Sequence, residues 1–533
     1  MRYLLWHLVD DSAARNPDAE AIRCRGESLT YGALAAASNR LAHLLAEHGV
    51  RPGDRVGILM NKRVECAVAI YGIMKAGAAY VPLDPGAPTE RHAFVANDCG
   101  IRCVVTEPRK RAAVSRLHAA HPLATVVGCE IESESEGCRS MGFAALEACE
   151  AARPPAVHAM EQDLSYILYT SGSTGVPKGI MHSHRSGLAW AEVTVDAYGF
   201  DGADRISNYA PLHFDLSTLD YFSAALAGST TVMIPEDVTK VPASLAALIA
   251  GEALTVFYTV PLALTQLATS GCLDGNDCAQ LRWVLFGGEQ MPPKHLAALM
   301  AALPGARFCN VYGPTETNGC THFPIAPDHV HDAPVPIGRP YRNVEALVVD
   351  ADDQPVAPGE VGELLIRAPT LMRGYWGREE LNARSAFLRR EFAGVPDRFH
   401  RTGDLVYALP DDNLQFVGRK DRQIKSRGCR VDLDEVEAVM LALDSVSEAA
   451  VYPVTDGDGH QLIEARAIPA AHARSGETLS ESMLRSLLRR QLPPYAVPVR
   501  LDIVDDFPRT STGKVDRVTL AREATAARAP GGD

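Results

Sequence analysis

Short apolar runs alternate with longer amphipathic segments over most of the chain. Residues 29–49 place four leucines on one stripe at helical spacing, and residues 67–78 form a second helical segment with Gly77 as a candidate C-cap. The apolar runs 56–60 and 124–127 are typical of short buried strands. Strands that alternate with helices predict an α/β fold, with mostly parallel sheets covered by helices.

The strand pattern recurs at residues 164–169, 232–235, 256–259 and 283–286. In sheets of this kind, ligands bind beyond the carboxyl ends of the strands. The residues that this rule gathers around one crevice are Thr259, Gly287, Gly288 and Tyr312.

The first of these strands leads into Tyr169–Gly179, which reads YTSGSTGVPKG. Glycine lets backbone N–H groups approach an anion closely, and the hydroxyls and the lysine add donors and a positive charge. The spacing differs from that of the common phosphate loop and from that of a nucleophile elbow, so Ser173 is not interpreted as an acyl nucleophile. A flexible surface turn is the alternative. The predicted phosphate-binding residues are Thr170, Ser171, Gly172, Ser173, Thr174 and Lys178.

The segment Asn310–Thr317 reads NVYGPTET. An aromatic ring before Gly-Pro gives a rigid turn with a flat face, which suits Tyr312 to stacking on a base. Glu316 is a hard oxygen ligand of the kind that Mg²⁺ takes beside phosphates. The alternative is that Tyr312 belongs to the core and that Glu316 begins a helix.

Two charged segments follow. Asp404 ends an Arg-Thr-Gly-Asp sequence and can hold ribose hydroxyls, while the planar fork of Arg419 suits a ribose or phosphate oxygen. Residues 419–430 carry six basic side chains in twelve positions, in a chain of net charge −14. That local excess favours an acidic partner or a polyanionic ligand, with a solvated hinge as the alternative.

Size and composition narrow the class of protein. A chain of 533 residues exceeds what one hydrophobic core supports, so two or more domains are expected. The net charge of −14 argues against a nucleic-acid-binding surface. Twelve scattered cysteines without a Cys-x-x-Cys pair favour reduced thiols in a cytoplasmic protein. No segment is typical of a signal peptide or a membrane span.

Taken in order, these segments resemble the adenylate-forming enzymes, and more closely the amino-acid adenylation domains of non-ribosomal peptide synthesis. The resemblance begins at Leu29-Thr30-Tyr31, includes KAGAAYVPLDP at 75–85, and ends with LPPY at 492–495 and PRTSTGKVDR at 508–517. It covers nearly the whole chain. It implies a large N-terminal core, residues 1–420, and a small mobile α+β domain, residues 421–533, with Asp421 at the hinge.

The resemblance implies a reaction in two halves. An amino-acid carboxylate attacks the α-phosphate of ATP and releases pyrophosphate; a thiol then displaces AMP. Because the first step joins two anions, neutralising charge matters more than acid–base catalysis. The implied catalytic residues are Lys514, Glu316 and Lys178, with Mg²⁺ on Glu316. The implied ATP-binding residues are Thr170, Ser171, Gly172, Ser173, Thr174, Gly288, Tyr312, Gly313, Thr315, Asp404, Phe416 and Arg419.

Asp215 matches the position that holds the substrate ammonium in amino-acid-activating relatives. A buried carboxylate needs a charged partner, whereas capping of the helix that follows is the alternative role. The other matched pocket residues are apolar or small, which predicts an apolar amino acid, and the two glycines suggest room for one larger than alanine. The segment around Asp215 also resembles free-standing prolyl-activating enzymes, and a β-amino acid stays open. These pocket residues are Leu216, Leu219, Thr259, Leu285, Gly287, Val311, Gly319 and Cys320.

The expected thiol donor is a separate carrier protein with a phosphopantetheine arm, because the chain ends shortly after Lys514. An acidic carrier is expected to dock near residues 419–430. Within that segment Cys429 stands where relatives often have an aromatic residue or His.

Three alternatives belong to other classes. An acyl- or aryl-CoA ligase of the same fold would need no ammonium-binding Asp215, and an inactive homologue would not need Lys178 and Lys514. A zinc site would have to use His182/His184 or His329/His331, without a Cys or a third His at ligand spacing.

Overall fold

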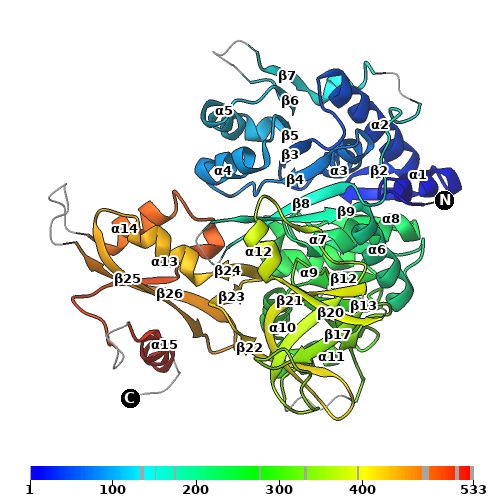
Figure 1. Cartoon of the computed structure of the whole chain (residues 1–533). Helices are drawn as coiled ribbons and strands as arrows, with labels where there is room; N and C mark the ends of the chain where they lie inside the picture. The colour runs from blue at the N-terminus through cyan, green and yellow to red at the C-terminus, as the bar shows by residue number, and fades with distance from the viewer. Residues whose placement is uncertain are drawn as a thin grey trace.

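The computed structural model describes residues 2–131, 137–149, 152–172, 176–274, 278–328, 333–392, 395–470, 479–509 and 515–528. Two large sheets, which are mainly parallel, and the helices around them form most of the molecule (Figure 1). The predicted α/β fold is therefore confirmed. No helix within these ranges is both long and apolar enough to cross a bilayer.

A nine-stranded sheet runs in the order β16-β15-β14-β13-β12-β10-β11-β1-β2. Its central strands are parallel, and β2, β15 and β16 join antiparallel at the edges. The three later apolar runs predicted as strands correspond to β11, β12 and β13. The strands are β1 (Glu20–Cys24), β2 (Glu27–Thr30), β10 (Arg205–Asn208), β11 (Thr230–Met233), β12 (Val256–Thr259), β13 (Trp283–Gly287), β14 (Arg307–Tyr312), β15 (Thr321–Ile325) and β16 (Arg339–Pro340).

An eight-stranded sheet runs in the order β19-β9-β8-β4-β3-β5-β6-β7, and strands β8, β4, β3, β5, β6 and β7 are parallel neighbours. Its strands are β3 (Arg55–Leu59), β4 (Ala79–Pro82), β5 (Cys103–Thr106), β6 (Thr125–Gly128), β7 (Arg139–Gly142), β8 (Leu164–Thr170), β9 (Lys178–Ser183) and β19 (Gly374–Tyr375). The helices that flank the two sheets include α2 (Tyr31–Glu47), α3 (Glu65–Lys75), α4 (Thr89–Cys99), α5 (Arg111–Ala120), α6 (His184–Tyr198), α9 (Pro242–Gly251), α10 (Pro261–Ser270) and α11 (Pro293–Ala302).

Smaller sheets complete the chain. A five-stranded sheet contains β17 (Glu345–Val349), β18 (Gly362–Arg367), β20 (Ala386–Phe392), β21 (Val395–Ala408) and β22 (Leu414–Arg419). The last strands form a hairpin, β23 (Gln423–Ser426) and β24 (Cys429–Asp432), and a three-stranded sheet, β25 (Val446–Thr455), β26 (Gln461–Pro469) and β27 (Arg500–Ile503). Helices α13 (Leu433–Leu441), α14 (Glu481–Leu488) and α15 (Arg517–Ala526) lie with them, orange to red in Figure 1, on one side of the molecule.

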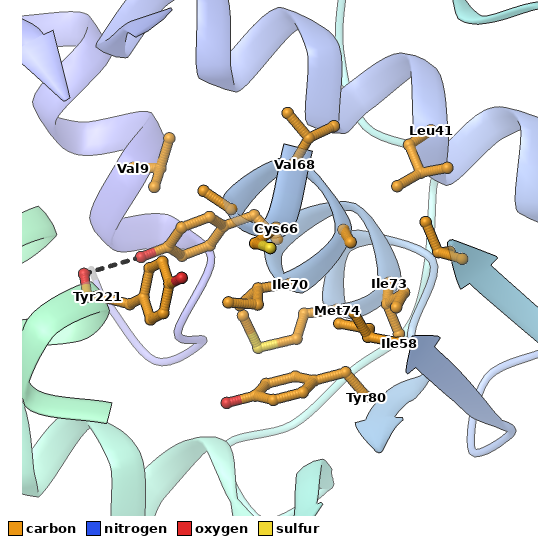
Figure 2. Packing of buried hydrophobic residues seen from close by; sticks show 14 of the residues in the cluster. Val9, Leu41, Ile58, Cys66, Val68, Ile70, Ile73, Met74, Tyr80 and Tyr221 are labelled. Atoms are coloured by element: carbon orange, nitrogen blue, oxygen red, sulfur yellow. Dashed lines mark hydrogen bonds between the residues drawn. The ribbon is translucent and has the colours of Figure 1, made fainter. Parts of the chain in front are cut away.

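Helix α3 lies in the middle of the largest hydrophobic cluster, and every residue from Cys66 to Lys75 is buried. Figure 2 shows its side chains between Leu41 of α2 and Tyr80 of β4. The Tyr71 hydroxyl donates to the Tyr221 carbonyl oxygen at 3.0 Å, which satisfies a polar group inside this core. The predicted helix 67–78 begins and ends earlier than expected.

The helix ends early because Gly77 adopts a positive φ of 78°. An added Cβ at Gly77 would also meet Val157 at 2.6 Å. The turn therefore requires glycine, and the chain leaves it directly into β4.

Helices α2 and α3 pack closely at Gly72, which leaves no room for a side chain. A Cβ at Gly72 would lie 2.8–2.9 Å from three side-chain atoms of Leu41. We expect Gly72→Ala to destabilise the fold by about 1–3 kcal/mol, because the core cannot accept the added methyl without shifting. Gly251→Ala is the matched control, since nothing lies within 4 Å of its added Cβ and alanine favours a helix. Equal thermal unfolding midpoints for the two variants would contradict this packing.

Candidate functional site

The carboxyl ends of β8, β12 and β14 face a cavity of about 60 Å³. Its wall includes Asp215, Tyr258, Val311 and Gly319 from the N-terminal part of the chain. The β23–β24 hairpin contributes Lys425, Gly428 and Arg430. The predicted crevice is therefore present, and the hairpin near the C-terminus forms part of it.

The four residues expected around the crevice do not all reach it. Strand register pairs Thr259 with Phe286 and Gly287 with Val311, so the ends of β12, β13 and β14 are level with one another. Gly288 lines the cavity. From β12 the lining residue is Tyr258, because successive side chains of a strand point to opposite faces.

Glu316 lies beside the cavity, is 1% exposed, and accepts hydrogen bonds from three side chains. Its Oε1 accepts a hydrogen bond from Lys178 Nζ at 3.0 Å and one from the Tyr375 hydroxyl at 2.9 Å. Its Oε2 accepts one from the Arg430 guanidinium at 2.7 Å. These contacts join β9, the turn after β14, and β24.

Opposite charges decide the ionisation of Glu316. Burial favours a raised pKa, but the Arg430 and Lys178 cations outweigh it and hold the pKa of Glu316 well below its usual range. Burial lowers the pKa of Lys178, and Glu316 partly offsets that shift. The structure thus keeps an ionised carboxylate between two cations, and an anionic ligand could compete for those cations.

Asp404 and Tyr312 form a second polar group. The Tyr312 hydroxyl and the Arg419 guanidinium both donate to the Asp404 carboxylate. Arg419 also pairs with Asp421 at 2.7 Å. The Tyr312 ring is 8% exposed and packs in a cluster that includes Phe416, as the core alternative predicted, while its hydroxyl belongs to the polar group.

Asp215 lies in the cavity wall at the start of α7 (Leu216–Thr218). Its side chain makes no capping hydrogen bond, so the helix-capping alternative is wrong. Burial raises the pKa of Asp215, and the Lys425 cation and the Thr315 hydroxyl oppose that rise. Among the wall residues that the structure describes, Asp215 is the one acidic side chain.

Apart from Gly287, the other predicted pocket residues divide into two groups. Leu216, Val311 and Gly319 line the cavity. Those buried behind the wall at 0% exposure are Leu219, Thr259, Leu285 and Cys320.

Neither of the two pocket glycines leaves empty space at the position where a Cβ would stand. A Cβ at Gly287 would lie 2.3 Å from the carbonyl oxygen of Val311. A Cβ at Gly319 would lie 2.2 Å from the indole of Trp190. Each glycine allows a close approach of neighbouring atoms and leaves no empty volume, a relation that the sequence did not reveal.

The Gly-rich segment is described in part. Thr170 and Ser171 line the cavity, and the Ser171 hydroxyl donates to the Arg430 carbonyl oxygen at 3.0 Å. The Thr170 Oγ1 is buried and has no hydrogen-bond partner among the described residues. An unsatisfied hydroxyl in a cavity wall fits a ligand that supplies an acceptor. Ser173, Thr174 and Lys514 lie outside the described residues.

Most basic side chains of the segment 419–430 have acidic partners within the chain. Lys420 pairs with Glu363 at 2.9 Å, and Arg422 pairs with Glu437 at 3.2 Å. Arg419, Lys425 and Arg430 face the acids of the site, as given above. Most of this positive charge therefore neutralises acids within the chain.

The histidines weighed for zinc have other partners. His182 Nε2 lies 2.9 Å from the Thr315 carbonyl oxygen, and His184 Nδ1 accepts from the Leu5 N–H at 3.1 Å. Within the described ranges, no three His, Cys, Asp or Glu side chains are grouped so that they could hold a metal ion. His329 and His331 lie outside those ranges.

Two family models match the chain. Residues 9–376 match the model described as AMP-binding enzyme, and residues 435–514 match the one described as AMP-binding enzyme C-terminal domain. The chain belongs to the AMP-binding enzymes. It is an AMP-forming ligase that uses ATP, as the resemblance predicted.

Relatives of this AMP-binding enzyme match it over nearly its full length. An L-proline–[L-prolyl-carrier protein] ligase of Pseudomonas fluorescens is 34% identical over 98% of this chain and 99% of its own. A ligase of the same name from Streptomyces coelicolor is 37% identical over 93% of this chain and 92% of its own.

Solved structures agree with the fold. An amide bond synthetase from Marinactinospora thermotolerans superposes with a TM-score of 0.85 at 26% identity, over 98% of this chain and 99% of that one.

In this AMP-binding enzyme the β23–β24 hairpin contacts the N-terminal part through Gly428. Its N–H donates to Glu289 Oε1 at 2.6 Å, and a Cβ at Gly428 would meet Val260 at 2.7 Å, so the contact requires glycine. The neighbouring Cys429 is buried, and its thiol donates weakly to the Arg427 carbonyl oxygen at 3.6 Å.

Glu289 makes this contact sensitive to pH. Burial raises its pKa to about 7, although the Gly428 N–H and Lys425 lower it. Its Oε2 has no hydrogen-bond partner in the described part of the chain and lies 3.9 Å from His460 Nδ1. Asp456, whose charge raises the pKa, and the Cys429 thiol are further titratable neighbours.

The sign of this pH dependence follows from the two pKa values. A free glutamate titrates near 4.5, so at intermediate pH Glu289 is protonated in the contact and ionised when the hairpin moves away. The contact is therefore favoured at low pH and weakens by about 1.4 kcal/mol per pH unit as pH rises towards 7.

We expect Glu289→Gln to abolish that dependence while keeping an acceptor for Gly428. The native-to-variant ratio of hydrogen-exchange rates at the Gly428 amide, taken at equal pH so that intrinsic rates cancel, should rise about 20-fold between pH 5.5 and pH 7.5. A native-to-variant ratio that is the same at both pH values would refute the role of Glu289.

Proposed function

We propose that this AMP-binding enzyme activates a small apolar amino acid, with L-proline as the first candidate, and transfers it to the phosphopantetheine thiol of a separate carrier protein. The observation that carries the proposal is Asp215, the one acidic side chain among the cavity-wall residues that the structure describes. The relatives named as L-proline–[L-prolyl-carrier protein] ligases support the substrate and the partner. A β-amino acid of similar size is the alternative.

Electrostatics explain why Asp215 selects an amine. A buried carboxylate without a cation is costly, and truncating one partner of a buried pair costs about 3–5 kcal/mol. The cation that does most to lower the pKa of Asp215 is Lys425, which belongs to the β23–β24 hairpin. When that hairpin withdraws, a substrate ammonium would replace Lys425, whereas a fatty or aryl acid would leave Asp215 unpaired.

The first half-reaction needs positive charge where two anions meet. A carboxylate oxygen of the amino acid attacks the α-phosphorus of ATP, and the bond to the leaving pyrophosphate breaks. Lys178 and Arg430 are held beside Glu316 and could turn to phosphate oxygens. We assign Lys514 to the same task by its match to the family motif.

Glu316 is the residue that would hold Mg²⁺. It offers one ionised carboxylate, and Mg²⁺ in phosphate sites usually takes one or two protein carboxylates. When bound, the ion would neutralise charge on the phosphates. We also assign to ATP two groups with polar atoms that could bind it. These are Thr170, whose buried hydroxyl lacks a partner among the described residues, and the hydrogen-bonded group Tyr312–Asp404–Arg419.

The second half-reaction fits the arrangement of the hairpin. We assign residues 1–420 to the core and 421–533 to the mobile domain, because β22 and β23 lie in different sheets and Asp421 falls between them. With Lys425 and Gly428 at the cavity, the structure is consistent with the stage at which the carrier thiol attacks the adenylate carbonyl and AMP leaves.

Amino-acid-dependent pyrophosphate exchange tests the substrate. We expect turnover with L-proline and similar small apolar amino acids, and none above background with fatty or aryl acids. A β-amino acid as best substrate would replace proline, and preference for an aryl or fatty acid would contradict the proposal in favour of a CoA ligase.

Substitution at the acid gives the matching prediction. Asp215→Asn should lower kcat/KM by at least about 100-fold, because a substrate ammonium loses its buried partner. Asp196→Asn is the control, because that side chain is exposed and lies on the outer end of α6. An unchanged kcat/KM in Asp215→Asn would show that the acid does not bind the amine.

A further inference from the structure

Trp190 occupies the volume that the sequence assigned to the substrate. It lies on α6, is 2% exposed and forms part of the cavity wall together with Asp215, Tyr258 and Val311. Its indole covers Gly319 so closely that an added Cβ would lie 2.2 Å from one ring carbon and 2.6 Å from the next. The boundary of the pocket at this point is the tryptophan ring, and Gly319 is the residue that allows it to come so near.

Two buried tyrosines hold the position of the Trp190 indole. Its ring meets that of Tyr341 edge-on, with centroids 5.8 Å apart, and the Tyr341 hydroxyl is hydrogen-bonded to that of Tyr198. Both tyrosines are 2% exposed, so the ring cannot turn outward without disturbing a packed cluster.

The helix that carries Trp190 is also anchored at both ends. Ser183 and Ser186 form a capping box at its start, and Gly199 ends it in the left-handed region with a φ of 60°. A ring on such a helix has little freedom to adapt to a larger ligand. It can therefore act as a rigid limit on ligand size.

We propose that Trp190 is the residue that limits substrate size in this enzyme, by filling the space beside Gly319. This inference rests on the proposed function, because it assumes that the amino-acid side chain enters the cavity beside Asp215. A rigid wall close to the ammonium site admits a compact side chain and excludes a long or branched one. The preference for a proline-sized substrate then comes from a residue on α6, an element that carries none of the other predicted pocket positions.

The test compares pyrophosphate exchange of Trp190→Leu with that of the native enzyme. The measured quantity is the kcat/KM of L-phenylalanine divided by that of L-proline, a ratio that does not depend on the amount of folded enzyme. We expect the ratio to rise at least about ten-fold, since one methylene in an apolar pocket is worth roughly 10–200-fold. Phe308→Leu is the matched control, because Phe308 is 1% exposed but lies in a different hydrophobic cluster and outside this cavity wall, and it should leave the ratio unchanged.

A second variant covers the case in which Trp190→Leu does not fold. Gly319→Ala presses a methyl against the indole and should shift preference the opposite way, towards amino acids smaller than proline. Where Trp190→Leu does fold, combining it with Gly319→Ala should restore the turnover that the alanine removes. Unchanged ratios in folded variants would overturn the role of Trp190 and leave the proposed function intact. Absence of exchange with every amino acid in the native enzyme would overturn both.

Discussion

A buried carboxylate must be paired with positive charge, and this site is arranged around two such acids. Glu316 has two cations and a tyrosine hydroxyl around it, drawn from three different parts of the chain. Asp215 has fewer partners. The cation that most lowers its pKa is Lys425, which comes from the β23–β24 hairpin. The hairpin therefore contributes charge to both acids, and its position affects both.

This shared dependence connects the fold to the proposed reaction. If the hairpin moves, Arg430 leaves Glu316 and Lys425 leaves Asp215, so both acids need new partners at the same time. A magnesium ion beside ATP and a substrate ammonium have the right charge for these two positions. Ligand binding and domain movement would then be coupled through the desolvation of two carboxylates, with no need for a separate switch.

Local patterns predicted much of the fold. The apolar runs became strands within one or two residues, and the leucine stripe of residues 29–49 became the buried face of α2, because each reflects burial on a regular element. The stop of α3 at Gly77 was predicted within one residue, because a glycine after the last helical turn is a local signal, whereas the expected span ran past it to Ala78. The family motifs also brought Lys178, Glu316, Asp404 and Arg419 to one region.

Contacts between distant segments could not be predicted from local patterns. Nothing near Gly319 in the sequence indicates that Trp190 covers it, so an apparent vacancy was assigned to the substrate. The basic residues 419–430 were expected to face a partner, yet most pair with acids elsewhere in the chain. Tyr258 was missed for a simpler reason, since choosing its neighbour Thr259 selected the opposite face of the strand.

The proposed reaction depends on a negative charge at Asp215 that binds the amine of the substrate. The most direct measurement compares L-proline with its ring-oxygen isostere, tetrahydrofuran-2-carboxylate, which has nearly the same shape and the same carboxylate but no ammonium. Adenylate formation with the isostere should fall by at least about 1,000-fold in kcat/KM, because Asp215 is then left buried and unpaired. Similar values for the two acids would contradict it.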